Sequence, residues 1–285
     1  MIIVQLRGGL GNQMFQYAVG LGLAEKNNTG LKLDLSWYDN IAAGDTPRIF
    51  SLDNYSITSG IATSEEAARL EPGFFDRLSE KLKNRLDTDR HYRFDPALFH
   101  LKGDYRLAGF YQSYKFFEFL RDRLSAEFRL KNRWSDDGES FRQKIAEGTR
   151  NVGLHIRRGD YAHDKKTNLY HGACSAEYYQ AALSEMKKRI GNFKLFVFSD
   201  EIEWAGKNIN WPGEIEYVSR TGLPDFEELL LMSYCRHQII ANSSFSWWAA
   251  WLNNNPEKII ISPKIWLQAA DIDKKDLIPG NWLEI

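Results

Sequence analysis

The sequence is poor in cysteine. Only Cys174 and Cys235 occur, and neither belongs to a CxxC pair or to a histidine and cysteine spacing that binds zinc. A disulfide scaffold and a zinc ribbon are therefore excluded, and we expect two reduced, buried thiols. Net charge is also nearly absent, since 37 basic residues balance 38 acidic ones. This balance excludes nucleic acid as an expected partner, so any anionic ligand must be held by a local cluster.

Long hydrophobic runs are missing as well. The stretch 238–256 carries no charge, but asparagines and serines interrupt it well below the roughly 18 apolar residues of a membrane span. The first residues, MIIVQLRGGLG, are too short an apolar run for a signal peptide. We therefore expect a chain that begins at Met1, has no transmembrane segment and works in the cytoplasm.

The hydrophobic fraction is 43% of 285 residues, which predicts a globular chain with one large or two modest domains. The start has the pattern of a βαβ unit: an apolar stretch at 1–6, a glycine turn, a helix to about Lys26 and a second apolar stretch at 31–35. In that helix Gly20 and Gly22 leave little bulk, so the backbone can lie close to a sheet. A mostly helical, charged stretch follows, with one strand-like piece at 105–110, and we assign 1–148 to an amino-terminal α/β domain.

The second half alternates strands and helices. We predict strands at 151–157, 194–200, 214–219, 237–242 and 258–262, with helices at 175–190, from 224 to about 236, and from 244. Strands separated by helices form a parallel sheet, whose ligands bind at the carboxyl ends of the strands. We therefore assign 149–285 to a second α/β domain, with a binding site at that edge.

Three of the predicted strand ends carry polar residues that suit a nucleotide diphosphate. Arg157 and Arg158 follow the first, and their planar guanidinium groups can bind phosphate oxygens in pairs. Asp200 ends the next strand and can accept hydrogen bonds from a base or a ribose. Ser244 and Ser246 open a helix, and helix N-termini bind anions. A charged turn, a helix cap or a core position would explain each feature alone, but their co-location favours a phosphate site without metal.

The glycine-rich turn supports a second interpretation. Gly9 and Gly11 match the G-x-G-x-x-G pattern of dinucleotide-binding loops, although Met14 replaces the third glycine, and Asp34 stands where an acid would bind ribose. An NAD(P)-dependent oxidoreductase is therefore a competing enzyme class. Against it, Asn12 at the helix start suits hydrogen bonding to a sugar or a phosphate.

Two D-x-D triplets, Asp87–Asp89 and Asp271–Asp273, have the form of a motif that holds a divalent ion against a diphosphate. Both lie in charged, loop-like stretches. We interpret them as solvated surface and expect neither a metal nor another cofactor. Trp247, Trp248 and Trp251 are expected in the core and not as a stacking platform.

Four segments resemble, in order and spacing, the motifs of glycosyltransferase family 11, the α-1,2-fucosyltransferases. They are GGLGNQMFQYA at 8–18, HIRRGDY at 155–161, FSD at 198–200 and SSFSWWAAWL at 243–252. The resemblance implies a GT-B-like pair of Rossmann-type α/β domains, the first on the acceptor side and the second binding GDP-fucose. It also implies inverting, metal-independent transfer of L-fucose from GDP-β-L-fucose to the 2-hydroxyl of a terminal galactose. The expected partners are GDP-fucose and a β-galactoside, including one carried on a lipid.

Animal members of the family carry a membrane anchor that this sequence lacks, so the resemblance is to a bacterial type. Two alternatives stay open beside the oxidoreductase: a fucosyltransferase of another linkage, and a nucleotide-sugar binding module without turnover.

The resemblance also implies roles for individual residues. It puts Arg157 on the β-phosphate of the donor, His155 and Asp200 near the guanosine, and Asn12 beside the diphosphate and the sugar. The other expected donor-binding residues are Gly9, Gly11, Arg158, Ser244, Phe245 and Ser246.

The residues at these motifs offer no nucleophilic cysteine, no Ser-His arrangement and no paired carboxylates at motif spacing that could form a covalent sugar intermediate, so we expect a single displacement. Asp160 is the acid nearest to the arginines and our candidate for the general base, although pairing with Arg158 or capping a turn would explain it equally well. His163 and His171 are further candidates on the same predicted loop.

Overall fold

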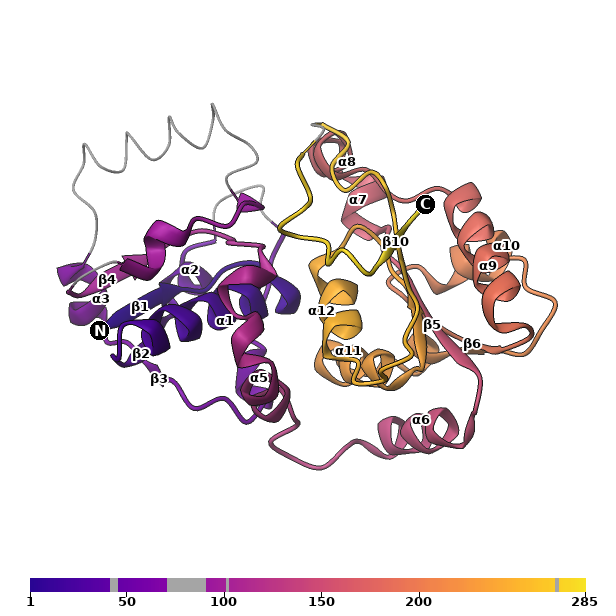
Figure 1. The fold of residues 1–285 in the computed structure, drawn as a ribbon, viewed down its shortest axis with the longest axis horizontal. Helices are drawn as coiled ribbons and strands as arrows, with labels where there is room; N and C mark the ends of the chain where they lie inside the picture. Colours follow the sequence, from indigo (N-terminus) through magenta and orange to yellow (C-terminus); the bar gives the residue numbers. More distant parts are fainter. Residues whose placement is uncertain (42–45, 71–90, 101–102, 270–271) are drawn as a thin grey trace. The chain divides into compact units, whose positions relative to one another are not determined.

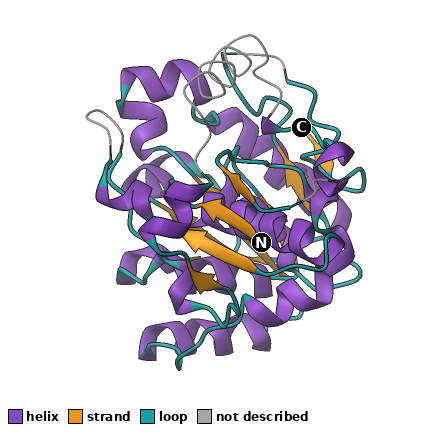
Figure 2. Ribbon diagram, turned by 90° about the vertical axis from the view of Figure 1, so that its left-hand side faces the viewer, coloured by secondary structure: helices purple, strands orange, loops and turns teal. Residues whose placement is uncertain are grey.

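The structure is a computed structural model that describes residues 1–41, 46–70, 91–100, 103–269 and 272–285. The chain forms two compact units (Figure 1). The first comprises Met1–Lys131 and Ile272–Pro279, and the second comprises Asn132–Asp271 and Gly280–Ile285. In the described residues each unit contains one parallel β-sheet with accompanying helices. Figure 2 shows the strands in orange and the helices in purple. Two Rossmann-type α/β domains, as expected for a GT-B-like chain, are therefore confirmed.

The sheet of the first unit has the order β3-β2-β1-β4, and all its strands are parallel. Its strands are β1 (Ile2–Gln5), β2 (Leu31–Asp34), β3 (Gly60–Ile61) and β4 (Tyr105–Leu107). Its helices are α1 (Leu10–Lys26), α2 (Ser36–Asp39), α3 (Ser64–Arg69) and α5 (Arg121–Glu127), with 3-10 turns at η1 (Leu52–Asn54), η3 (Pro96–His100), η4 (Tyr114–Phe116) and η5 (Glu118–Leu120). The predicted βαβ unit is confirmed as β1, α1 and β2.

Two glycines let α1 approach its neighbours closely. A Cβ at Gly20 would lie 2.5 Å from Cγ2 of Val4 on β1, which confirms the predicted close approach to the sheet. A Cβ at Gly22 would lie 2.2 Å from the carbonyl oxygen of Phe116, so this glycine packs against η4 and not against the sheet.

We expect Gly22→Ala to lower the free energy of unfolding by about 2 kcal/mol, because the added methyl group meets backbone that cannot rotate away. Chemical denaturation would measure the loss. Gly30→Ala is the matched control, since a Cβ there meets nothing within 4 Å. Equal stabilities of the two variants would contradict the close packing of α1 against η4.

The sheet of the second unit has the order β10-β9-β8-β5-β6-β7, and every pair is parallel. Its strands are β5 (Asn151–Ile156), β6 (Lys194–Ser199), β7 (Ile215–Tyr217), β8 (His237–Ile239), β9 (Ile260–Ser262) and β10 (Leu283–Glu284). Its helices are α6 (Asp136–Glu147), α7 (Gly159–His163), α8 (Lys165–His171), α9 (Ala176–Ile190), α10 (Ile202–Asn208), α11 (Asp225–Tyr234) and α12 (Ser244–Leu252), with one 3-10 turn at η6 (Val218–Thr221).

Strand β5 lies in the middle of this sheet, and all its residues are buried. From β5 the chain proceeds to β6 and β7 on one side and then returns to β8 and β9 on the other. The strand order therefore reverses between β5 and β8. In open α/β sheets, ligands bind outside the carboxyl ends of the strands at this reversal. The topology therefore indicates that a ligand would bind at the residues that follow β5 and β8.

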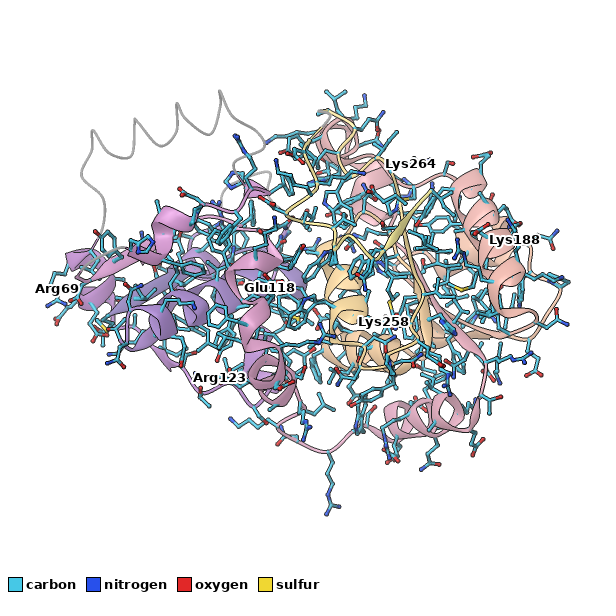
Figure 3. The ribbon with its side chains drawn as sticks, viewed as in Figure 1. Arg69, Glu118, Arg123, Lys188, Lys258 and Lys264 are labelled. Atoms are coloured by element: carbon cyan, nitrogen blue, oxygen red, sulfur yellow. The ribbon has the colours of Figure 1, made fainter. Side chains whose placement is uncertain are left out.

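Helix α12, which follows β8, is anchored at both ends. The Ser243 hydroxyl accepts the N–H of Phe245 at the start. At the other end Lys258, labelled in Figure 3, donates to the carbonyl oxygens of Ala250 and Asn253, each at 2.8 Å. The expected core tryptophans of this helix, Trp247, Trp248 and Trp251, are buried.

The predicted domain boundary at 148 is wrong, because α6 belongs to the second unit. Ser135, which caps α6, donates its N–H and its hydroxyl to the carboxylate of Glu227 on α11 at 2.8 and 2.6 Å. The first unit also includes Ile272–Pro279, a segment near the end of the chain. There Asp276 accepts the N–H of Phe94 at 2.8 Å and pairs with Lys115 at 2.6 Å.

Residues 159–171, predicted as a loop, form α7 and α8. Asp164 caps α8 by accepting the N–H of Thr167 at 2.7 Å.

Both cysteines are free and buried, as expected, and burial raises the pKa of the Cys174 thiol to about 11. Among the described residues, no helix is both long and apolar enough to cross a membrane.

Candidate active site

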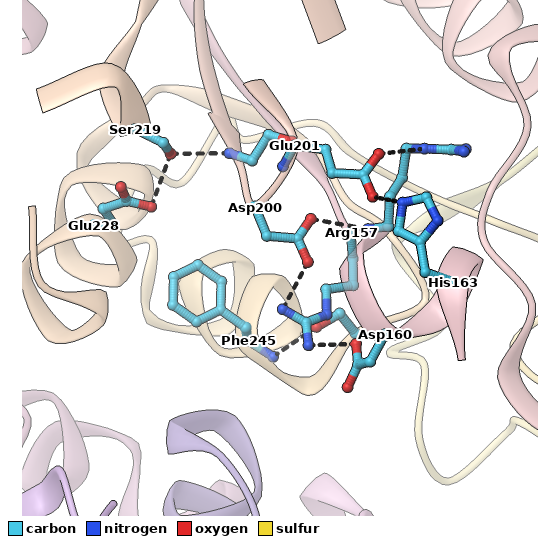
Figure 4. A network of polar contacts seen from close by, with 11 residues as sticks. Arg157, Asp160, His163, Asp200, Glu201, Ser219, Glu228 and Phe245 are labelled. Atoms are coloured by element: carbon cyan, nitrogen blue, oxygen red, sulfur yellow. Dashed lines mark hydrogen bonds and ion pairs between the residues drawn. The ribbon is translucent and has the colours of Figure 1, made fainter. Parts of the chain in front are cut away.

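Arg157 follows β5 and is held between two carboxylates (Figure 4). Its Nη2 lies 2.6 Å from Oδ1 of Asp160 on α7, and its Nη1 lies 2.8 Å from Oδ2 of Asp200 after β6. The side chain remains 21% exposed. These two contacts use one N–H of each terminal nitrogen and fix the orientation of the guanidinium, so its remaining N–H donors can bind an anion at the carboxyl edge of the sheet.

Both carboxylate oxygens of Asp200 contact other residues of the chain. Its Oδ1 accepts the N–H of Arg158 at 2.9 Å, while Oδ2 pairs with Arg157. A Cβ at Gly159 would lie 2.7 Å from Oδ2, so glycine is needed for this approach. Asp200 therefore joins the ends of β5 and β6 and orients Arg157. Hydrogen bonds from a guanosine would have to compete with both of these contacts.

The two adjacent arginines point to different partners. The guanidinium carbon of Arg158 lies 4.1 Å from the centre of the Trp204 ring on α10, and its Nε lies 3.2 Å from Oε2 of Glu201. The Arg158 side chain thus packs on Trp204 and forms an ion pair with Glu201. The expected role of Arg158 in binding the donor is not supported by this arrangement.

His155 and Phe245 connect the two strands that flank the reversal. Their rings lie 5.1 Å apart, one at the end of β5 and the other in the first turn of α12. Burial, helped by the charge of Arg157, lowers the pKa of His155 to about 3. The imidazole is therefore neutral at physiological pH and adds no positive charge to the site.

Helix α12 begins at Ser244, as predicted, and Ser243 is its N-cap. Ser246 is fully buried and its hydroxyl faces the carbonyl oxygens of Ala241 and Ser243, so its side chain is not presented to a ligand. The first turn carries no acidic residue. The partial positive charge of the helix start is therefore uncompensated, which suits an anion.

Glu228 is a candidate that the sequence analysis missed. Its Oε2 accepts the hydroxyl of Ser219 at 3.0 Å, and that hydroxyl in turn accepts the N–H of Ser199 at 2.9 Å (Figure 4). Burial, together with the charges of Asp225 and Asp200, raises the pKa of Glu228 to about 7. Among the described residues nothing donates to its other oxygen. In the sequence Glu228 looks like one of several acids that favour a helix start, and no pattern separates it from them.

The candidates for the general base have different surroundings. Asp160 is paired with Arg157. His171 on α8 stacks on Tyr161 at 4.6 Å, and burial lowers its pKa to about 4. His163, at the end of α7, contacts Glu201 at 2.5 Å and is mostly exposed.

In the first unit, the expected glycine-rich site lies at the start of α1. Gly9 is the N-cap and provides no side-chain cap, while Gly11 and Asn12 lie in the first turn. Oδ1 of Asn12 accepts a hydrogen bond from Gln112 at 2.7 Å. The first turn carries no acidic residue. This helix start is therefore also suited to a negatively charged or polar ligand.

The oxidoreductase interpretation was based on Gly9, Gly11 and Asp34, and Asp34 has another role. Arg106 donates to Oδ2 of Asp34 through Nε at 2.9 Å and Nη2 at 2.6 Å, and both side chains are more than nine-tenths buried. Burial alone would raise the pKa of Asp34, but hydrogen bonds from Ser36 and Arg106 lower it below its usual value. Asp34 is a buried ion-pair partner and is not presented to a ribose.

Most acids of the two D-x-D triplets fall outside the described residues. Asp87, Asp89 and Asp271 lie outside the described residues, and Asp273 forms an exposed pair with Lys275 at 2.7 Å. In the part of the chain that the structure describes, no group of three or more histidines, cysteines or acids could hold a metal ion.

Comparisons with known proteins identify the family of this chain. Residues 92–285 match the model of glycosyl transferase family 11. The chain is 33% identical to an alpha-1,2-colitosyltransferase of Escherichia coli, covering 100% of this chain and 98% of the relative. It is 31% identical to the O-antigen biosynthesis glycosyltransferase WbnK of Escherichia coli, covering 98% and 99%. It is 26% identical to galactoside 2-alpha-L-fucosyltransferase Sec1 of Mus musculus, covering 88% of this chain and 64% of the relative.

Proposed function

Because the chain belongs to glycosyl transferase family 11 and is a glycosyltransferase, we propose that it transfers L-fucose from GDP-β-L-fucose to the 2-hydroxyl of a terminal galactose. One observation carries the proposal: Arg157, held by Asp160 and Asp200, lies where the strand order reverses and α12 begins without an acid. A fixed cation and a helix start at this place suit a diphosphate leaving group.

The mechanism that fits this arrangement is a single displacement. The acceptor hydroxyl attacks C1 of the sugar from the face opposite GDP, and negative charge develops on the β-phosphate. Arg157 and the N–H groups at the start of α12 would stabilise that charge, because they are already oriented before the reaction. One displacement inverts the anomeric carbon, so a β-linked donor gives an α-linked product.

We assign the guanine contact to Glu228 and not to Asp200. Guanine presents an N1–H and a 2-amino group side by side, and a carboxylate can accept both. Glu228 has one oxygen without a donor from the described residues, whereas both oxygens of Asp200 are engaged. In this arrangement Asp200 orients Arg157, and Glu228 distinguishes guanine from other bases.

In the first domain we retain Gly9, Gly11 and Asn12 as substrate-binding residues. The support comes from the uncapped start of α1 and the absence of acids in its first turn. The amide of Asn12 keeps its Nδ2 donors for a sugar or a phosphate oxygen, since Gln112 uses its Oδ1.

Colitose is a specific alternative to fucose as the transferred sugar, because one Escherichia coli relative is named a colitosyltransferase. Colitose differs from fucose by the absence of the 3-hydroxyl, so a GDP site of the same construction would serve either donor. The other Escherichia coli relative is named for O-antigen biosynthesis, which favours an O-antigen glycan as the acceptor.

The test is to incubate the protein with GDP-fucose or GDP-colitose and a β-galactoside such as lactose, and to analyse the product by NMR. We expect GDP release and an α-linked fucose on the galactose 2-hydroxyl. A β-linked product would refute single displacement, and another attachment position would refute the linkage. If the protein transfers only colitose, the donor sugar is colitose and not fucose.

Transfer should persist in excess EDTA, because the charge on the leaving group is assigned to Arg157 and to the start of α12. GDP release before and after chelation would measure this. Loss of activity that returns on addition of Mn²⁺ or Mg²⁺ would contradict the assignment and make Asp87 and Asp89 the first candidates for ligands.

A further inference from the structure

Glu201 and His163 form a coupled pair beside the phosphate-binding edge. Glu201 follows β6, and its carboxylate has two partners: Oε1 lies 2.5 Å from Nε2 of His163, and Oε2 lies 3.2 Å from Nε of Arg158 (Figure 4). Its backbone N–H donates to the Ser199 hydroxyl at 3.0 Å. The carboxylate is thus fixed in position, while the His163 side chain is 72% exposed.

This geometry points to a general base. A carboxylate that accepts the Nε2–H of an imidazole selects one tautomer, leaves a lone pair on Nδ1 and stabilises the imidazolium once it forms. Among the described residues none hydrogen-bonds to Nδ1 of His163. We propose that His163 is the general base of the transfer and that Glu201 orients it. The proposal rests on the GDP-sugar transfer proposed above.

The position of His163 on α7 is compatible with this role. Asp160, on the same helix, pairs with Arg157, and His163 follows it after about one turn. One turn of an α-helix rises about 5 Å. His163 therefore follows the residue that holds the phosphate-binding arginine by about one helical turn.

The neighbouring acids and imidazoles are less suited to the role. Asp160 is paired with Arg157, and Asp200 uses both of its oxygens. His155 and His171 are buried, and burial lowers the pKa of each well below its ordinary value, so they accept a proton poorly at neutral pH.

The step balances without a further reactant. The acceptor hydroxyl gives its proton to Nδ1 of His163 as its oxygen bonds to C1 of the sugar. The bond from C1 to the phosphate oxygen breaks, and its electron pair leaves with GDP. The imidazolium, stabilised by Glu201, then returns its proton to water.

The first test is His163→Ala in the full chain, with His100→Ala as a control because His100 is exposed and has no role in the proposed site. We expect kcat to fall by about 10² while the affinity for GDP, measured by calorimetry, stays unchanged. Added imidazole should restore part of the lost rate in His163→Ala and leave His100→Ala unaffected. A kcat within a few-fold of wild type, or the absence of rescue, overturns the proposal.

The second test is the double variant with Glu201→Gln. If Glu201 acts through His163, then Glu201→Gln should lower kcat in the wild-type background and have almost no further effect in His163→Ala. Additive losses would overturn the pairing. Failure of the wild-type chain to use any GDP-sugar would instead refute the proposed function, and the base assignment with it.

Discussion

Arg157→Lys should lower turnover by a factor on the order of 10² or more, comparable to removing one preorganised donor from an oxyanion site. Lysine keeps the positive charge but loses the planar fork that contacts Asp160 and Asp200 and still presents donors to an anion. Steady-state kinetics with the GDP-sugar donor would measure the loss. Thermal unfolding should change little, because the side chain is partly exposed and the charge is kept.

Two other arginines provide the comparison. Arg142→Lys is the matched control: Arg142 pairs with Glu139 on α6, away from the site, and should leave turnover unchanged. Arg158→Lys loses the contact with Trp204 and weakens the pair with Glu201, so we expect a smaller loss than for Arg157→Lys. If Arg158→Lys abolished transfer while Arg157→Lys retained it, the assignment of the two arginines would be reversed.

Glu228→Gln should weaken GDP binding by about 10-fold to 10²-fold, the range for a hydrogen bond to a charged group. An amide offers guanine one acceptor and one unwanted donor in place of two acceptors. The sharpest measurement is the ratio of affinities for GDP and IDP by calorimetry, since IDP lacks the 2-amino group. We expect the wild-type chain to prefer GDP and the variant to lose most of that preference.

Glu227→Gln is the control for this experiment. Glu227 is buried and accepts hydrogen bonds from Ser135 at the start of α6, so its loss should lower stability and leave the ratio of GDP to IDP affinity unchanged. An unchanged ratio in Glu228→Gln would return the guanine contact to Asp200.

The raised pKa of Glu228 adds a pH signature. Burial raises this pKa to about 7, so the carboxyl is mostly protonated at pH 6 and mostly charged at pH 8. Only the charged form accepts both guanine donors. The affinity for GDP should therefore rise between pH 6 and pH 8, and the rise should be smaller in Glu228→Gln.

The local elements could be predicted from the sequence because their signals act between neighbours in the chain. The apolar stretch at 151–157 predicts β5. The capping serine before α9 and the glycine after it predict where α9 begins and ends. The membership of α6 in the second unit could not be predicted. It depends on Glu227, more than ninety residues away, which accepts both donors of Ser135.

The sequence by itself determined which strand ends carry charge, because motif spacing and apolar periodicity locate those ends without any tertiary contact. Only the tertiary structure decided how the charges are used. Consecutive side chains diverge where a strand ends, so Arg157 meets Asp160 and Asp200 while Arg158 meets Trp204 on α10. Likewise Glu228 becomes a ligand candidate because folding brings Ser219 to one of its oxygens, while no described residue donates to the other.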